Sequence, residues 1–256
     1  MELKGKIAVV TGGASGIGEA LCRRFHAEGA KGVVVVDINA EDAQRVADEI
    51  GGIAMTADVS HEPDIQRVVN DTEEQLGPID LFCSNAGIGI ADPSHAASAD
   101  NESWERIWGI NVMAHVYAAR AVLPAMIERG EGYLLNTSSA AGLLSQVGSA
   151  PYAVTKHAAV GFAESLAITH GDDGIKVSVL CPQAVLTAMT RDSGGGSAAG
   201  DGMIMPEELA DCTIEALRNE QFLILPHPQV KTYMERKVSD YDRWIRGMQR
   251  WRSKFV

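Results

Sequence analysis

The stretch K-I-A-V-V-T-G-G-A-S-G-I-G, from Lys6 to Gly18, determines the fold expected of the whole chain. Its apolar first half predicts a buried strand. The second half is a glycine-rich loop, and an apolar segment compatible with a helix then runs to Glu28. Another apolar run, G-V-V-V-V-D, follows and ends in Asp37. Strand, glycine loop, helix, strand and terminal acid together form the unit that binds a dinucleotide.

The same unit indicates which dinucleotide binds. The loop glycines would let the backbone approach a pyrophosphate, and the free amides of the following helix N-terminus would bind it. Asp37 lies nineteen residues after Gly18, where its carboxylate would accept hydrogen bonds from the adenosine ribose hydroxyls. A 2′-phosphate would be repelled there, and the loop contains no Arg or Lys to bind one. We therefore expect NAD rather than NADP.

Apolar runs and helical segments alternate along the rest of the chain. The predicted strands are 6–11, 32–37, 52–57, 80–84, 133–138, 176–180 and 222–225. The predicted helices after the first are 41–50, 61–76, with Ser60 as N-cap, 102–128, 151–170 and 206–218. Seven apolar strands separated by helices predict one α/β domain with a Rossmann-type, doubly wound parallel sheet and helices on both faces.

A later stretch, N-T-S-S-A-A-G-L-L-S-Q-V-G-S-A-P-Y-A-V-T-K from Asn136 to Lys156, carries the chemistry. Tyr152 and Lys156 are four residues apart and would share one face of a helix. The ammonium favours the phenolate, so we expect the tyrosine pKa to fall from about 10 toward the range of an acid/base catalyst. Ser139, thirteen residues before the tyrosine, would hold the substrate oxygen.

Composition excludes several other classes of protein. The net charge of −12 argues against nucleic-acid binding. No apolar run reaches membrane-spanning length and no secretory signal opens the chain, so we expect a cytoplasmic protein. Cys22, Cys83, Cys181 and Cys212 have no paired spacing, which indicates reduced core cysteines rather than a zinc site or disulfides. The histidines form no metal-ligand pattern either, so no metal is expected.

Over nearly its whole length the chain resembles the short-chain dehydrogenase/reductase family. The motifs that carry the resemblance are T-G-G-A-S-G-I-G at Thr11, S-N-A-G at Ser84, Asn111, N-T-S-S at Asn136, Y-A-V-T-K at Tyr152 and P-Q-A-V-L-T at Pro182. The resemblance implies that Ser139, Tyr152 and Lys156 form the catalytic set, with Asn111 holding a water in the proton relay. Lys156 would also bind the nicotinamide ribose.

The resemblance also implies most of the cofactor contacts. Asp58 and Val59 would contact the adenine end, and residues around Val185 and Thr187 would meet the nicotinamide carboxamide. The full expected cofactor set is Gly12, Ser15, Gly16, Ile17, Gly18, Asp37, Ile38, Asp58, Val59, Asn85, Ala86, Gly87, Tyr152, Lys156, Pro182, Val185 and Thr187. The family's usual Pro-Gly is Pro182-Gln183 here, so substrate specificity cannot be transferred from relatives that have glycine at that corner.

These residues predict an NAD-dependent oxidoreductase that interconverts a secondary alcohol and a ketone. The expected pocket residues are mostly apolar and uncharged, which predicts a neutral, moderately hydrophobic small-molecule substrate. They are Ala140, Leu144, Gln146, Gln183, Ala184, Met189 and the run 203–205. One alternative is an NADPH-dependent ketoreductase, against which Asp37 argues. Another is a non-catalytic cofactor-binding scaffold, against which the intact Ser139, Tyr152 and Lys156 argue.

Two segments do not follow the α/β pattern. The glycine-rich segment 190–205 is expected to be a substrate lid, with a plain surface loop as the alternative. The tail, 229–256, has eight Lys/Arg and three Asp/Glu, a local charge of 8 − 3 = +5. Its apolar residues recur at helical spacing: Tyr241, Trp244, Ile245, Met248, Trp251 and Phe255. We expect this stripe to pack on a neighbouring subunit of a homodimer or homotetramer, with binding to an anionic membrane surface as the alternative.

Overall fold

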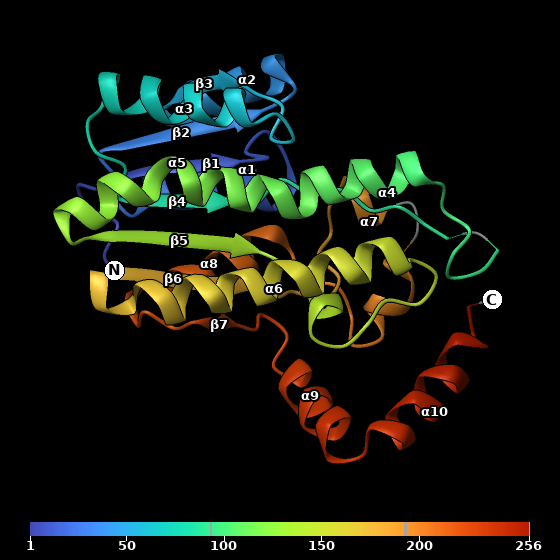
Figure 1. Ribbon diagram of the computed structural model, residues 1–256. Helices are drawn as coiled ribbons and strands as arrows, with labels where there is room; N and C mark the ends of the chain where they lie inside the picture. Colours follow the sequence, from blue (N-terminus) through green and yellow to red (C-terminus); the bar gives the residue numbers. More distant parts are fainter. Residues whose placement is uncertain (93, 192–193, 256) are drawn as a thin grey trace.

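Seven parallel strands form one sheet in the order β3-β2-β1-β4-β5-β6-β7 (Figure 1). The strands are β1 (Ile7–Thr11), β2 (Gly32–Asp37), β3 (Ile53–Thr56), β4 (Leu81–Ser84), β5 (Gly132–Thr137), β6 (Ile175–Leu180) and β7 (Leu223–Ile224). The computed structural model describes residues 1–92, 94–191 and 194–255. The predicted single-domain, doubly wound Rossmann-type fold is confirmed.

Helices cover both faces of the sheet (Figure 1). The α-helices within the described residues are α1 (Gly16–Ala27), α2 (Ala40–Ile50), α3 (Glu62–Gln75), α4 (Asn101–Trp108), α5 (Ala114–Arg129), α6 (Ala150–His170), α7 (Ala188–Arg191), α8 (Pro206–Arg218), α9 (Gln229–Ser239) and α10 (Tyr241–Arg252). Alternate strand residues point to opposite faces. Val10 and Val35 therefore pack with α1, α2 and α8, whereas Val9 and Val34 pack with α3, α5 and α6.

The sheet reverses its strand order between β1 and β4, and the loops after these two strands are tied together. The Thr11 hydroxyl accepts hydrogen bonds from the amides of Asn85 and Ala86 at 2.9 and 3.1 Å. The Asn85 side chain donates to the Thr11 carbonyl at 3.1 Å. Ligands of doubly wound sheets bind outside the carboxyl ends of the strands at such a reversal, so the chain order places the crevice here.

Two predicted helix boundaries are wrong. The long helix 102–128 is divided, because a π-helical turn, Gly109–Met113, separates α4 from α5. Such turns insert one extra residue into a helix and occur frequently at functional sites. Ser60 is not the N-cap of α3. His61 occupies that position, while the Ser60 hydroxyl and amide both donate to the carboxylate of Asp58, at 2.6 and 2.9 Å.

The continuous helical run Asn101–Arg129 also corrects the expectation that no apolar segment is long enough to span a membrane. By length and composition this run could span a membrane, because it contains an 18-residue window with a mean hydropathy of 1.3. However, 44 % of that window is buried inside the protein, and Ala118, Val122 and Met126 pack in the core against α3, β4 and β5. These contacts are those of a helix that packs in the protein core against the sheet.

The last two helices project from the sheet as a separate hairpin (Figure 1). Val230 on α9 is fully buried. Lys237, also buried, donates from Nζ to the carbonyls of Leu143 and Leu144 at 2.8 and 2.9 Å. Its ammonium lies 4.9 Å from the Trp244 ring centroid on α10. One lysine thus ties both tail helices to the segment that follows β5.

Candidate active site

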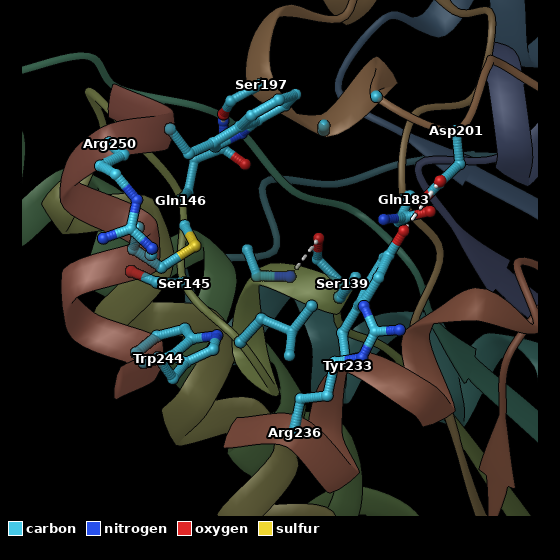
Figure 2. Close-up of a pocket in the computed structure, with 18 of the residues that line it drawn as sticks. Ser139, Ser145, Gln146, Gln183, Ser197, Asp201, Tyr233, Arg236, Trp244 and Arg250 are labelled. Carbon is cyan, nitrogen blue, oxygen red and sulfur yellow. Dashed lines mark hydrogen bonds between the residues drawn. The ribbon is translucent and has the colours of Figure 1, made fainter. Parts of the chain in front are cut away.

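Two cavities open at the carboxyl edge of the sheet, and Ser139 and Gln183 line both of them. The first is a groove of about 360 Å³ over the ends of β1, β2 and β4. The second, of about 650 Å³, lies between the segment that begins at Ser139 and the helices α9 and α10 (Figure 2). The two cavities meet at polar side chains, which allows a ligand in the groove to approach one in the pocket.

The glycine loop leaves no room for side chains at the β1 end of the groove. A Cβ atom on Gly18 would lie 2.0 Å from the Gly12 carbonyl oxygen. A Cβ atom on Gly12 would lie 2.9 Å from Cα of Ala86, and the φ angle of Gly12, +65°, also disfavours other residues. The bare backbone before α1 can therefore approach a pyrophosphate, which is the arrangement that a bound dinucleotide requires.

The carboxylate of Asp37 is fixed at the end of β2. One oxygen accepts a hydrogen bond from the Ala14 amide and the other from the Asn39 amide, both at 3.1 Å. The glycine loop itself contains no Arg or Lys, but a cation reaches it from α2. The Arg45 guanidinium donates to the Ala14 carbonyl at 3.1 Å. The Arg45 guanidinium is already paired with the carboxylates of Glu19 and Glu49.

Most of the expected cofactor residues line the groove. Those that do are Gly12, Ser15, Gly16, Ile17, Asp37, Ile38, Asp58, Val59, Asn85, Ala86, Gly87, Tyr152, Lys156, Pro182, Val185 and Thr187. Gly18 does not, because it is buried beneath the loop against the Gly12 carbonyl. The residues present therefore fit a dinucleotide that extends from the acid at β2 to the Tyr152 side chain.

Tyr152 and Lys156 on α6 meet Ser139, which follows β5, where the groove joins the pocket. Lys156 is 3 % exposed, and its Nζ donates to the Thr137 carbonyl at 3.1 Å. The ammonium lies 5.6 Å from the centroid of the Tyr152 ring. The Ser139 hydroxyl accepts from the Ala141 amide at 3.1 Å and donates to the Pro182 carbonyl at 3.3 Å.

The acidity of Tyr152 differs from the expectation. Burial raises the pKa of the Tyr152 phenol above its ordinary value of 10, and this effect is larger than the decrease caused by hydrogen bonding to Ser139. Burial also lowers the pKa of Lys156 to about 8. The net pKa of the Tyr152 phenol is thus raised, not lowered as expected. The ammonium lies beside the ring and is directed to Thr137, so it does not offset the desolvation of the phenol.

Asn111 lies in the π-helical turn and is completely buried. Its amide nitrogen donates to the Ile88 carbonyl at 2.9 Å and to the Thr155 hydroxyl at 3.2 Å, and its oxygen accepts from the Ile88 amide at 2.9 Å. A Cβ atom on Gly87 would lie 3.3 Å from both Asn111 Oδ1 and Lys156 Nζ. The three residues are thus neighbours, and the Asn111 side chain is fully used in holding the loop after β4.

Beneath this site the sequence analysis missed a buried histidine. His115 on α5 is 2 % exposed, and neither of its ring nitrogens has a hydrogen-bond partner within residues 1–92, 94–191 and 194–255. The Asn136 amide and the Thr137 hydroxyl are likewise unpartnered. Burial and the nearby Lys156 cation lower the pKa of His115 to about 3. The imidazole is therefore neutral, and no motif indicated its position.

The larger cavity contains four of the expected substrate residues: Ala140, Leu144, Gln146 and Gln183. Gln146 donates to the Ser197 hydroxyl at 2.9 Å, which connects the pocket to the glycine-rich segment. Residues 197, 198, 200 and 201 of that segment form one wall. Two residues of the expected lid, 192 and 193, lie outside the described part of the chain, and its function as a lid stays a prediction.

The other expected substrate residues do not line this cavity. Met189 lies in the groove instead, because α7 turns its sulfur toward Gly89, where it would be 3.9 Å from a Cβ atom. Ala184 is 1 % exposed, and Ile204 packs in the core under α8. Met203 and Met205 are exposed, at 38 % and 47 %, and do not line the cavity. Their position in sequence near a loop was not sufficient evidence for substrate contact.

The C-terminal helices line the cavity, which the sequence analysis did not predict. The contributing residues are Tyr233, Arg236, Ser239, Arg243, Trp244, Gly247, Met248, Arg250 and Trp251. Part of the aromatic stripe expected to meet another subunit therefore faces the chain's own pocket. The remainder is exposed: Tyr241 at 54 %, Ile245 at 42 % and Phe255 at 45 %. The helical spacing of aromatic residues was the available signal, but it does not identify the surface that they cover.

Gln183 has a polar atom available where the cavities meet. Its main-chain amide donates to Nδ1 of His227 at 3.2 Å, whereas its side-chain oxygen is buried without a partner in the described structure. His227 is 3 % exposed, and burial lowers its pKa. Figure 2 shows Gln183 and Ser139 on the same side of the pocket.

The fold, the phosphate-accommodating loop and a tyrosine beside a second pocket define the class of dinucleotide-dependent α/β enzymes.

Comparison with known proteins agrees with this assignment. The profile of the family described as short chain dehydrogenase matches residues 6–196. A 1-deoxy-11-beta-hydroxypentalenate dehydrogenase of Streptomyces exfoliatus is 34 % identical over 96 % of this chain and 91 % of its own. A meso-2,3-butanediol dehydrogenase of Serratia marcescens is 35 % identical over 74 % of this chain and 75 % of its own.

A solved short-chain dehydrogenase/reductase from Burkholderia phymatum, in complex with NAD, has a TM-score of 0.87. It is 27 % identical in sequence, and the alignment covers 94 % of this chain and 96 % of that one. The chain belongs to the short-chain dehydrogenase/reductase family. It is an oxidoreductase that acts on CH–OH groups, and its family binds a nicotinamide cofactor.

Proposed function

We propose that the protein is an NAD-dependent dehydrogenase that oxidises a secondary alcohol with a hydrophobic body, using Tyr152 as the acid/base residue. The observation that carries the proposal is the junction of the two cavities at Ser139, beside Tyr152 and Lys156. Relatives named for hydroxypentalenate and 2,3-butanediol, which are secondary alcohols, support the substrate class. The Asp37 carboxylate and the NAD of the Burkholderia structure support the cofactor.

The protein's groups divide the chemistry as follows. The Tyr152 oxygen takes the proton of the substrate hydroxyl, while the Ser139 hydroxyl donates a hydrogen bond to the same oxygen. Lys156 holds the nicotinamide ribose, and its charge stabilises the phenolate once the proton has been transferred. We propose that Asn111, whose side chain is committed to Ile88 and Thr155, holds a water through its main chain. When bound, the nicotinamide accepts the hydride from the alcohol carbon.

Tyr152→Phe is expected to lower kcat by about 100- to 10,000-fold, the usual contribution of a positioned acid/base group. Binding of NAD should stay within about threefold of wild type, because the phenol edge is a small part of the groove. Alcohol-dependent reduction of NAD at 340 nm and titration calorimetry with NAD measure the two effects. A variant that retains more than a tenth of the wild-type rate would rule out Tyr152 as the base.

The cofactor assignment depends on Asp37. We expect wild-type protein to reduce NAD at least about tenfold faster than NADP at equal subsaturating concentrations, since a 2′-phosphate would approach a fixed carboxylate. Asp37→Ser should weaken NAD binding by about tenfold and narrow that preference. Wild-type activity with NADP alone would favour the alternative, an NADPH-dependent ketoreductase. Binding of NAD without turnover of any alcohol would favour a scaffold.

We further propose a cytoplasmic homo-oligomer, either a dimer or a tetramer. The exposed tail residues Tyr241, Ile245 and Phe255 support a contact between subunits. Four free cysteines, of which Cys22, Cys83 and Cys181 are buried, support a reducing compartment. Light scattering of the full chain, and of a Tyr241→Ser/Ile245→Ser variant, tests the oligomer. A monomeric wild type at micromolar concentration would remove that proposal.

A further inference from the structure

The wall of the substrate cavity that α9 and α10 form is cationic. Arg236, Arg243 and Arg250 line it, and the only acidic side chain that lines it within the described residues is Asp201. The Asp201 carboxylate is already engaged, since it accepts a hydrogen bond from the Tyr233 hydroxyl at 2.9 Å. Formal charge on the lining is therefore 3 − 1 = +2. The chain as a whole carries −12, so this wall differs in sign from most of the protein.

These three guanidiniums have no carboxylate partner among the described residues. Six other arginines have one within the described part of the chain: Arg23, Arg24, Arg45, Arg67, Arg120 and Arg218. The Arg236 guanidinium also lies 5.8 Å from the Tyr233 ring centroid. The guanidiniums of Arg236, Arg243 and Arg250 therefore keep N–H donors available to a ligand.

The geometry of α10 brings two of them to one place. Arg243, Gly247 and Arg250 are spaced by four and three residues and so share a face of the helix. Helical side chains point back toward the N-terminus, and a Cβ atom on Gly247 would lie 4.0 Å from Nη2 of Arg250. Because Gly247 has no side chain, the Arg250 guanidinium can lie over it, toward Arg243. Figure 2 shows Arg250 and Trp244 across the cavity from Arg236 and Tyr233.

The lining of the cavity combines three kinds of side chain. Ser139 and Gln183 face the groove that holds Tyr152. Ala140, Leu144, Trp244, Met248 and Trp251 provide apolar surface. Arg243 and Arg250 line the cavity from α10, and Arg250 lies across it from Arg236 (Figure 2). Guanidinium groups bind carboxylates through paired, charge-assisted hydrogen bonds.

We propose that the substrate is a hydrophobic secondary alcohol that carries a carboxylate remote from its hydroxyl, and that Arg243 and Arg250 bind this carboxylate. The inference rests on the proposed function and names the substrate class for the same site. It replaces the expectation of a neutral substrate. That expectation did not include the tail, because the sequence did not place the tail at the pocket.

The test compares hydroxy acids with their methyl esters, from 3-hydroxybutanoate to 11-hydroxydodecanoate, under the cofactor conditions that support turnover. We expect kcat/KM for the best acid to exceed that of its ester by at least about tenfold at low salt. The double variant Arg243→Gln/Arg250→Gln should bring this ratio close to one, because it lowers kcat/KM for the acid far more than kcat/KM for the ester. Arg246→Gln/Arg252→Gln, on the same helix but outside the cavity, is the matched control and should keep the wild-type ratio.

A binding measurement gives a second readout that is independent of turnover. Titration calorimetry of dodecanoate and of methyl dodecanoate into the cofactor-loaded protein should show at least about tenfold tighter binding of the acid, lost in Arg243→Gln/Arg250→Gln only. Equal affinity for acid and ester, or an equal loss in the control variant, would overturn the inference. So would loss of binding to phosphatidylglycerol vesicles in Arg243→Gln/Arg250→Gln with an unchanged acid-to-ester ratio, since the arginines would then serve a lipid surface.

The two proposals fail in different ways. If esters and simple alcohols are oxidised but acids have no advantage in rate or binding, only the carboxylate inference fails. If dodecanoate binds in the predicted manner but no alcohol of any kind is oxidised, the proposed dehydrogenase function fails and the anion site remains. Thermal unfolding of each variant checks that the exposed arginines do not support the fold, and their midpoints should lie within about 2 °C of wild type.

Discussion

The cofactor groove and the substrate cavity share Ser139 and Gln183, but the chain builds them in different ways. The groove is made largely of backbone at strand ends, where the positions of Gly12, Asn85 and Gly87 follow from the sheet itself. The outer wall of the cavity is made of side chains on α9 and α10, two helices outside the sheet. The groove is therefore determined by the fold, whereas the cavity depends on how one hairpin packs on it.

This difference teaches where variation can be tolerated. Lys237 is the buried polar tie between the hairpin and the Leu143–Leu144 segment, and Val230 is its fully buried apolar anchor. The groove depends less on one contact, because many of its residues directly follow strands of one hydrogen-bonded parallel sheet. Substitutions on α10 should therefore alter substrate choice without affecting cofactor binding, and the following predictions test that separation.

The largest loss of NAD affinity is expected for Gly18→Ala in the groove. The new Cβ atom would lie 2.0 Å from the Gly12 carbonyl oxygen, and backbone must move to relieve the clash. Overpacking of this kind costs up to about 3 kcal/mol, so NAD affinity should fall by about 100-fold. Titration calorimetry with NAD measures this change.

The matched substitution on the cavity side is Gly247→Ala, where the nearest atom to the new Cβ would be the mobile end of Arg250 at 4.0 Å. It should leave NAD affinity within about twofold and the unfolding midpoint unchanged or slightly higher, because alanine favours helix by up to about 1 kcal/mol over glycine. Similar losses of NAD binding in both variants would contradict the separation of the two regions.

The second prediction concerns the core beneath the groove. His115 has a folded-state pKa of about 3 against an ordinary 6.5, so on acidification the unfolded chain takes up this proton first. The stability that a neutral His115 contributes is complete above pH 6.5. It is lost as pH falls from 6.5 toward 3, by up to about 1.4 kcal/mol per pH unit. His115→Gln, which cannot take up that proton, should unfold with a correspondingly shallower dependence on pH.

Urea unfolding at intervals between pH 4 and pH 7.5 measures that dependence. His95→Gln, made at an exposed imidazole, controls for the loss of one histidine as such. Parallel pH profiles for the wild type and His115→Gln would mean that His115 is protonated in the folded protein. In that case the site would contain a second cation near Lys156, and the neutral imidazole described above would be wrong.

The sequence alone predicted the parts of the molecule that depend on local pattern. Apolar runs fixed all seven strands, and glycine spacing with Asp37 located the groove, because strand ends and helix N-termini follow from chain order. It did not predict the π-helical turn at Asn111, since an inserted residue leaves the apolar periodicity nearly intact. The burial of His115 and the raised pKa of Tyr152 depend on tertiary packing, which adjacent residues do not determine.

The tail is the clearest case of what sequence could not decide. The spacing of Trp244, Met248 and Trp251 correctly indicated one apolar face of a helix. However, a membrane, another subunit and the chain's own pocket can each cover such a face. The decision depends on tertiary contacts over long separations, such as that of Lys237 with Leu143. Neither partner in that contact carries a motif.

The smallest loss of ligand affinity that we predict is on the cavity side, and it gives the sharpest test of the comparison. The Trp251 ring covers Gly200, since a Cβ atom there would lie 3.2 Å from Cζ2 of the indole, and the ring also packs edge-on against Phe255 at 5.1 Å. Trp251→Ala should raise KM for a bulky secondary alcohol by about three- to tenfold, the range expected when an aromatic contact is removed. It should leave kcat/KM for 2-butanol and the Kd for NAD within about twofold, because a small alcohol does not reach α10. Ile245→Ala, an exposed apolar residue of the same helix outside the cavity, should change none of these values. If Trp251→Ala weakened NAD binding as much as it raised KM, the tail would support the groove as well as the pocket, and the two regions would not be independent.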